Sequence, residues 1–153
     1  MRHKPIKNKL FVQNRQRLAE LMAPKSLAVL NANDVLPTNA DGSLPMQPNA
    51  DLFYLSGIEQ EESVLLLYPV AAEEKHREIL FLRQPNEHLQ IWEGYKHSKA
   101  DARKISGIKN VQWLSEFPGM FRSLMCEAES AYLNSNEHKR ATVKVETRDD
   151  RFI

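Results

Sequence analysis

The sequence predicts an α/β fold in which helices pack against a mixed β-sheet. Two observations support this: short apolar segments with the length of strands recur along the chain, and segments with the helical period of 3.6 residues stand between them. The 153 residues are 42% hydrophobic and 27% charged, which is typical of one globular domain. No internal repeat or linker divides the chain, so we expect a single domain over residues 1–153.

The predicted elements begin with a helix over residues 8–23, because its apolar side chains repeat on one face and Pro24 then stops it. A second helix is expected over 99–106, between a serine cap and a glycine stop, and a third over 117–128. The predicted strands are short apolar or alternating segments. They lie at 26–32, 52–57, 63–69, 78–82, 110–114, 130–134 and 142–146.

Two connections differ from the rest. Segments 63–69 and 78–82 are continuously apolar, as strands covered on both faces are, and the polar link 70–77 fits a hairpin or one helical turn. The segment 33–50 holds three prolines, a glycine and three asparagines, which predicts an unusually long loop. We expect part of that loop to contact another domain or a second subunit.

Charge and cysteine content restrict the class of protein. The chain has 21 basic and 20 acidic residues, a net charge of +1, so nothing in the balance indicates nucleic acid or an anionic membrane as a partner. The longest apolar run, 64–72, is far shorter than the ~20 residues that span a bilayer. The single cysteine, Cys126, lies in an apolar run and is expected to be buried, which fits a reducing, cytoplasmic location.

Motifs for catalysis are not found in the sequence. The five glycines are too far apart for a phosphate-binding loop or a nucleophile elbow. Glu73 and His76 could share a cation on a helix, but a solvated turn is the favoured interpretation. Acidic residues near the predicted strand ends could form a metal cluster, and solvated loop charges are favoured there too. These residues are Asp34, Asp41, Asp51, Glu59, Glu61, Glu62 and Glu93.

Two local features remain as candidate sites. In the first, polar and aromatic side chains gather before a glycine turn: Asp51, Phe53, Tyr54, Ser56 and Gly57. In the second, aromatic and acidic residues flank a glycine in what should be an exposed loop: Trp92, Glu93, Gly94 and Tyr95. An exposed tryptophan beside a glycine is often an interface or ligand contact, although Trp92 could equally fold back onto its own core.

Four segments together resemble a known family. They are 14-NRQRLAELM-22, 26-SLAVLNAN-33, 51-DLFYLSGIEQEESVLLLYP-69 and 78–108, which contains the W-x-G loop. Their order and spacing are similar to those of the amino-terminal domain of Xaa-Pro aminopeptidases (aminopeptidase P), in the creatinase and prolidase superfamily. The resemblance covers essentially the whole chain, and it rests on the joint occurrence of motifs that are individually unspecific.

The sequence departs from the family pattern at two places. Residues 46-MQPNA-50 stand where the family usually has Phe-Arg-Gln-Asp-Ser, and Lys96 stands where an arginine often follows the W-x-G glycine by two. Because lysine does not reproduce the planar, bidentate grip of arginine, contacts that depend on those arginines are in doubt here.

The resemblance implies a ribonuclease H-like α/β fold with about six strands, and it implies that catalysis takes place elsewhere. In the full enzymes a following pita-bread domain holds two divalent ions, usually manganese, and a bridging water attacks the bond before proline. We therefore expect no catalytic residue and no metal ligand in these 153 residues, and we interpret the chain as a piece that lacks the catalytic domain. The final residues, 149-DDRFI-153, look cut off rather than finished.

The resemblance also assigns roles within the chain. It places Trp92, with Glu93, Gly94 and Tyr95, near a substrate channel or subunit interface of a homo-oligomer that acts on proline-containing peptides. It makes Asp51, Phe53, Tyr54 and Gly57 structural. Two alternatives remain open: a free-standing dimerisation or interaction module, and the amino-terminal domain of a prolidase or another amide hydrolase of the superfamily.

Overall fold

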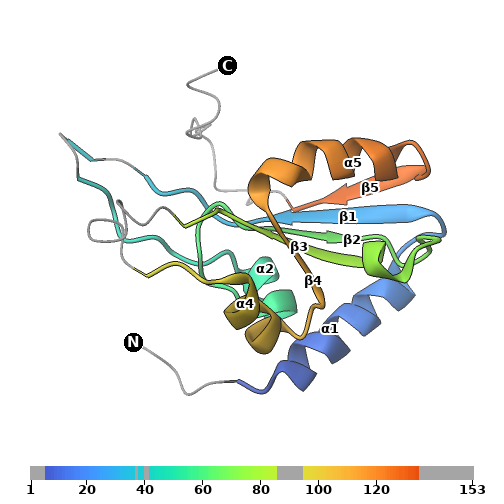
Figure 1. The fold of residues 1–153 in the computed structure, drawn as a ribbon, viewed down its shortest axis with the longest axis horizontal. Helices are drawn as coiled ribbons and strands as arrows, with labels where there is room; N and C mark the ends of the chain where they lie inside the picture. The colour runs from blue at the N-terminus through green and yellow to red at the C-terminus, as the bar shows by residue number, and fades with distance from the viewer. Residues whose placement is uncertain (1–5, 37, 40–41, 86–94, 135–153) are drawn as a thin grey trace, which may run out of the picture.

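The computed structural model describes residues 6–36, 38–39, 42–85 and 95–134. Its centre is a five-stranded mixed sheet with the order β4-β3-β2-β1-β5 (Figure 1). The inner strands pair antiparallel, and a parallel strand flanks them at each edge. The strands are β1 (Ser26–Asn31), β2 (Val64–Leu67), β3 (Glu78–Leu82), β4 (Asn110–Trp113) and β5 (Ser130–Leu133). The predicted α/β class is confirmed, and the strand count in the described residues is close to six.

Helices cover both faces of this sheet. Three of them, α1 (Asn8–Leu21), α2 (Ala50–Ser56) and α4 (Lys99–Ser106), lie on one face, and α5 (Phe117–Met125) lies on the other (Figure 1). Two short 3₁₀ helices complete the described elements: η1 (Glu74–His76) between β2 and β3, and η2 (Leu114–Glu116) before α5. The link 70–77 joins the antiparallel neighbours β2 and β3 and contains a single 3₁₀ turn, so both of its predicted forms are present.

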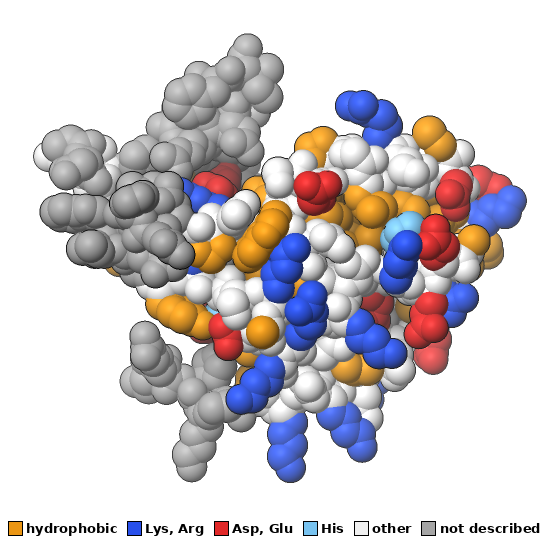
Figure 2. All heavy atoms as spheres, in the orientation of Figure 1, with side chains coloured by type: hydrophobic (Ala, Val, Ile, Leu, Met, Phe, Trp, Pro, Cys, Tyr) orange, Lys and Arg blue, Asp and Glu red, His pale blue; other side chains and the backbone are white. Residues whose placement is uncertain are grey.

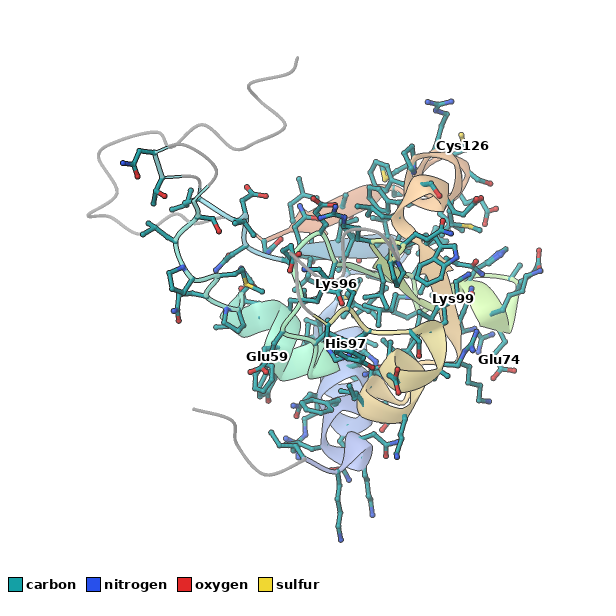
Figure 3. All side chains as sticks on the ribbon, turned by 60° about the vertical axis from the view of Figure 1, so that its left-hand side comes forward. Glu59, Glu74, Lys96, His97, Lys99 and Cys126 are labelled. Carbon is teal, nitrogen blue, oxygen red and sulfur yellow. The ribbon has the colours of Figure 1, made fainter. Side chains whose placement is uncertain are left out.

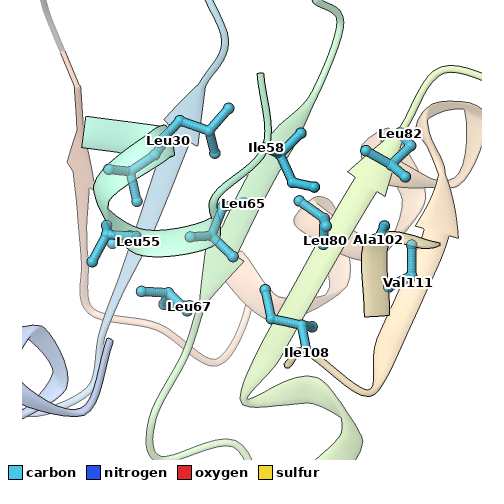
Figure 4. Packing of buried hydrophobic residues seen from close by; sticks show 12 residues of the cluster. Leu30, Leu55, Ile58, Leu65, Leu67, Leu80, Leu82, Ala102, Ile108 and Val111 are labelled. Atoms are coloured by element: carbon cyan, nitrogen blue, oxygen red, sulfur yellow. The ribbon is translucent and has the colours of Figure 1, made fainter. Parts of the chain in front are cut away.

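The core consists of two apolar clusters separated by the sheet. Because side chains alternate along a strand, Leu65 and Leu80 face the α1, α2 and α4 layer, whereas Leu66 and Phe81 face α5. Figure 4 shows the first cluster, in which Leu55 of α2 packs over the sheet. All residues of β2 are buried, so the prediction that the continuously apolar strands are covered on both faces is confirmed.

The caps predicted for the second helix are present in α4. The Ser98 side chain accepts a hydrogen bond from the Asp101 backbone N–H at 3.1 Å, which satisfies a donor that the first helical turn leaves free. Gly107 follows the helix with φ +75°, the left-handed conformation that favours glycine.

The segment 52–57 is a helix, and its prediction as a strand was wrong. The Asn49 side chain caps α2 by accepting hydrogen bonds from the backbone N–H groups of Asp51 and Leu52, each at 3.0 Å. Gly57 ends the helix with φ +71°. The aromatic and leucine residues suited a strand, but these caps and the helical spacing of the buried residues decide the conformation.

Arg15 joins α1 to three other elements beneath the surface. Its side chain is 1% exposed, and its Nη1 donates to the carbonyl oxygens of Leu55 at 2.8 Å and Ser106 at 3.0 Å. Its Nη2 donates to Glu78 Oε2 at 3.0 Å. The guanidinium therefore links α1 to the carboxyl ends of α2 and α4 and to the start of β3.

Two further predictions concern the carboxy-terminal part. Cys126 is exposed, so the expectation that it is buried was wrong. It caps the end of α5, while the apolar face of that helix is formed by residues such as Phe117, Phe121 and Leu124. The predicted helix over 117–128 ends at Met125. The predicted strand 142–146 lies outside the described residues.

The predicted long loop between β1 and α2 extends away from the sheet (Figure 1). At its base the Asn33 side chain donates to the Gln47 carbonyl oxygen at 3.0 Å and accepts from Asn49 Nδ2 at 3.1 Å. Farther out, Leu44 N–H bonds to the Leu36 carbonyl oxygen at 2.9 Å, and both leucine side chains are exposed. The contact of this loop with another domain or subunit stays a prediction.

Charge is unevenly distributed over the surface. Figure 2 shows Lys and Arg side chains gathered on the face that carries α1 and α4, where Lys7, Lys9, Arg17 and Lys104 are exposed. The near-zero net charge therefore conceals a local excess of positive charge. Among the described residues, no helix has both the length and the apolar character needed to cross a membrane.

Candidate functional site

The polar cluster that borders the W-x-G region is formed by two segments that are distant in the sequence. One is the loop between α2 and β2, which carries Glu59, Gln60 and Glu61, and the other leads into α4. Figure 3 labels Glu59 on the first segment and Lys96 and His97 on the second. The two segments enclose a hollow of about 590 Å³ lined by Glu59, Gln60, Glu61, Tyr95 and His97, which we call the Gln60–His97 hollow.

An ion pair and a hydrogen bond hold the two segments together. Lys96 Nζ donates to Glu61 Oε1, and the two side chains are only 10% and 14% exposed. Next to this pair, the His97 backbone N–H donates to Gln60 Oε1 at 2.7 Å. Because this pair is largely withdrawn from water, truncating either side chain would leave the charge of the other one uncompensated. The chain just after the W-x-G loop is thus fixed to the loop before β2.

Tyr95 is exposed but held in place. Its hydroxyl donates to Asp101 Oδ2 at 2.7 Å, and its ring meets the His97 ring edge-on with centroids 5.7 Å apart. Ser98 also donates to Asp101, and this hydrogen bond, followed by that of Tyr95, lowers the pKa of Asp101. The same contact with Asp101 raises the pKa of Tyr95. The ring is 73% exposed, so it presents an ordered aromatic surface beside the hollow.

His97 is half-buried at the inner wall of the hollow. Burial lowers the pKa of its imidazole, because the charged form loses solvation, and the negative charges of Asp101 and Glu59 act in the opposite direction. Among the described residues, two buried polar atoms near this wall, His97 Nδ1 and Gln60 Nε2, have no hydrogen-bond partner. Buried polar groups are usually paired, so two unpaired atoms from neighbouring residues require an explanation.

The two candidate sites that the sequence predicted lie on different segments of the chain. Of the W-x-G residues, Tyr95 lies at the hollow, whereas Trp92, Glu93 and Gly94 lie outside the described residues. The other group lies on or just after α2: Asp51 in the first helical turn, Phe53 edge-on against Phe11, Tyr54 exposed at the surface, Ser56 buried and Gly57 at the helix end. The assigned roles of both groups stay predictions.

Sequence reasoning named three of the five residues that line the hollow, Glu59, Glu61 and Tyr95, but it did not bring them together as one site. Gln60 and His97 were not singled out, and Glu61 and Lys96 were not connected with each other, because they are 35 residues apart. Lys96 was noted only as a replacement for arginine, and the structure shows that it forms a partly buried ion pair with Glu61. Within the described residues, no group of three or more His, Cys, Asp or Glu side chains is arranged to hold a metal ion.

Comparison with known proteins identifies the family. The family model described as "Aminopeptidase P, N-terminal domain" matches residues 11–133, which is most of the chain. The chain belongs to this family.

Proteins similar to this aminopeptidase P-type domain are much longer than the chain. The Xaa-Pro aminopeptidase of Escherichia coli (strain K12) is 28% identical over 141 residues, which cover 92% of this chain and 32% of that protein. The intermediate cleaving peptidase 55 of Saccharomyces cerevisiae is 40% identical over 57 residues, or 37% of this chain and 11% of that protein. The chain thus spans about a third or less of the length of these relatives.

Solved structures agree with this assignment. A structure described as an aminopeptidase P from Bacillus anthracis superposes with a TM-score of 0.81 at 28% identity, covering 96% of this chain and 35% of that one. Aminopeptidase P from E. coli, solved with the inhibitor Pro-Leu, gives a TM-score of 0.75 at 26% identity, covering 88% and 30%. The observed sheet and its helices are therefore those of an aminopeptidase P amino-terminal domain.

Proposed function

We propose that this chain is the non-catalytic amino-terminal domain of a metal-dependent Xaa-Pro aminopeptidase. The parent enzyme hydrolyses the bond between an amino-terminal residue and proline, and this domain shapes substrate access and contributes to subunit contacts. The observation that carries the proposal is the family match over residues 11–133, together with the much greater length of the relatives. A shared fold alone would not carry it, since one fold can host several activities.

The proposal assigns the two divalent ions, which we expect to be manganese, to a separate catalytic domain. The described residues do not fit such ions, because they include no suitable group of three ligands. Within this domain, the side chains next to the Gln60–His97 hollow would border the path of the substrate. Tyr95 supports this role, because its ring is exposed and yet fixed by Asp101 and His97.

A turnover assay tests this assignment. The purified 153-residue chain should release no amino acid from an Xaa-Pro peptide, with or without added manganese, because the metal ligands are proposed to lie in another domain. Release of the amino-terminal residue would refute the proposal. A longer parent protein that includes the catalytic domain is the positive control and should cleave the same peptide when manganese is present.

Reading the coding sequence beyond Ile153 gives an independent check. The proposal expects the frame to continue into a segment with spaced Asp, Asp, His, Glu and Glu ligands. A stop codon at that point would instead favour a free-standing interaction module. If the metal ligands are present but the longer protein cleaves only dipeptides, a prolidase is favoured.

A further inference from the structure

Two buried atoms of residues that line the Gln60–His97 hollow have no hydrogen-bond partner among the described residues. One is Nε2 of Gln60, a residue that is 5% exposed. Its Oε1 already accepts from the His97 backbone N–H at 2.7 Å. This bond fixes the orientation of the amide, because the reversed amide would place two donors against each other. Gln60 Nε2 is therefore a buried donor that needs an acceptor.

The second atom, His97 Nδ1, has the opposite character. Because burial disfavours the charged form of the ring, the imidazole is neutral at neutral pH, and with the proton on Nε2 its Nδ1 is an acceptor. The donor and the acceptor thus belong to two residues that are already hydrogen-bonded to each other. Leaving both unpaired costs free energy, which a ligand that pairs with both would recover.

The charges at the hollow do not select a charged ligand. Lys96 neutralises Glu61, and Glu59 has an interaction of its own. The hollow therefore requires a neutral group that accepts one hydrogen bond and donates another. A residue of an extended peptide meets this requirement, because its N–H and C=O point to the same side, as they do in a hydrogen-bonded pair of an antiparallel sheet. The volume of about 590 Å³ is within the range of small-molecule sites.

We propose that the Gln60–His97 hollow binds one residue of an extended peptide through the backbone groups of that residue. The N–H of the bound residue donates to His97 Nδ1, and its C=O accepts from Gln60 Nε2. The Tyr95 ring lines the same hollow and is 73% exposed, so it offers an apolar surface to the side chain of the ligand. The choice of an amide follows from the donor and the acceptor and does not use the proposed function.

Nuclear magnetic resonance titration of the full ¹⁵N-labelled chain with two matched probes tests the proposal. N-acetyl-alaninamide carries the N–H and C=O of one residue, whereas O-acetyl-lactamide has an ester oxygen in place of that N–H. We expect saturable shifts of the Gln60 side-chain amide and the His97 backbone amide with both probes, and about tenfold tighter binding of the first. Equal affinities, or no saturable shift, would show that the hollow holds water alone and would overturn the proposal.

Two substitutions assign the two hydrogen bonds. His97→Phe removes the acceptor, so the two probes should then bind with equal affinity. Gln60→Glu keeps the acceptor for the His97 N–H but removes the donor, so it should weaken the binding of both probes by a similar factor of about ten. Gln13→Glu, at an exposed position on α1, is the control and should change neither affinity. A preference for N-acetyl-alaninamide that survives in His97→Phe would contradict the assigned geometry.

A measurement without substitution covers the case in which His97→Phe does not fold. When the pH is lowered until the His97 ring protonates, as its own imidazole signals report, Nδ1 becomes a donor and the preference for N-acetyl-alaninamide should disappear. The charged groups that face the ring are Asp101, Glu59 and the Lys96–Glu61 pair. A preference that is the same before and after this protonation would overturn the proposal.

The probes also keep the two proposals distinguishable. Neither probe contains an Xaa-Pro bond, so failure to bind would remove the peptide site and leave the proposed function standing. Turnover of an Xaa-Pro peptide by the 153-residue chain would instead refute the proposed function without bearing on the hollow.

Discussion

At the scale of single residues, the structure depends on a few buried polar side chains that have many partners. Arg15 is the clearest case, since one guanidinium serves two helix ends and a strand. Its presence in the first helix was visible in the sequence, but its partners were not, because Leu55, Glu78 and Ser106 meet it only in the folded chain. An arginine on a helix is more often exposed, and nothing in its spacing distinguishes Arg15 from Arg17.

Arg15→Met should lower the free energy of unfolding by about 3–5 kcal/mol. The substitution leaves the Leu55 and Ser106 carbonyl groups and the Glu78 carboxylate without their donor, which is the expensive way to break a buried charge pair. Urea unfolding followed by circular dichroism measures the change. Arg17→Met, an exposed position on the same helix, is the control and should stay within about 0.5 kcal/mol. Equal effects of the two changes would show that the Arg15 contacts contribute little.

His97 should make the stability sensitive to mild acid. Its pKa is lowered in the folded state, so between the ordinary value of about 6.5 and the lowered value the unfolded chain binds more protons, and stability falls as the pH falls. One such group contributes at most about 1.4 kcal/mol per pH unit in this window. Above about pH 6.5 its contribution is constant.

Urea unfolding at pH 7.5 and pH 5.5 measures this effect, and His97→Leu should reduce the difference between the two values. The facing charges are Asp101, Glu59 and the Lys96–Glu61 pair, and the pKa of Asp101 is also lowered. The Asp101 contribution is lost only as the pH falls below its ordinary value of 3.8, which lies below both measurements. If the stability of His97→Leu still falls by the same amount between pH 7.5 and pH 5.5, another group causes the acid sensitivity.

At the scale of elements, the sequence predicted a helix where capping residues flank a regular pattern of apolar side chains. The caps of α4 were recognised because Ser98 and Gly107 enclose the helix. The cap of α2 was missed because Asn49 follows Pro48 in a loop-rich segment, and the side chains after it have high strand propensity. The Gln60–His97 hollow was missed for another reason: its two walls come from separate loops.

Gly57→Ala should destabilise the protein by about 2–4 kcal/mol, because two penalties add. Alanine is strained at φ +71°, and its Cβ would lie 2.5 Å from a ring carbon of Phe11. Chemical denaturation measures the loss. Gly119→Ala in α5 is the matched control: no atom of the described residues outside its own helical turn lies within 4 Å of the added Cβ, so the better helix former should stabilise the protein by up to about 1 kcal/mol. Similar losses at both positions would contradict the packing around Gly57.

At the scale of the whole molecule, the sequence predicted the architecture better than the site. Continuous apolar strands and amphipathic helices indicate layers, because burial of apolar surface dominates folding, and the layered sheet was confirmed. The ion pair between Lys96 and Glu61 could not be predicted in this way, because charged loop residues carry no periodic signal of their partners.

The sheet should couple the two apolar clusters into one cooperative unit. Leu124 is buried on the α5 face, whereas Trp113 packs against the cluster on the opposite face. Leu124→Ala should cost about 2–5 kcal/mol, and Trp113 fluorescence should report the same shift in midpoint as circular dichroism. A Trp92→Phe background leaves Trp113 as the only tryptophan. An unshifted Trp113 midpoint would show that the two layers unfold separately.

The pairing of β1 with β5 can form only late in the synthesis of the chain. The register joins Ser26 to Ser130, so the first strand made receives its outer neighbour only after almost the whole described chain has left the ribosome. The hairpin of β2 and β3 is local and can form early, but closing the β1–β5 contact carries a large loop entropy. Until residue 133 emerges, β1 can pair with β2 but its other edge stays unpaired, and this interval is when chaperone protection matters most.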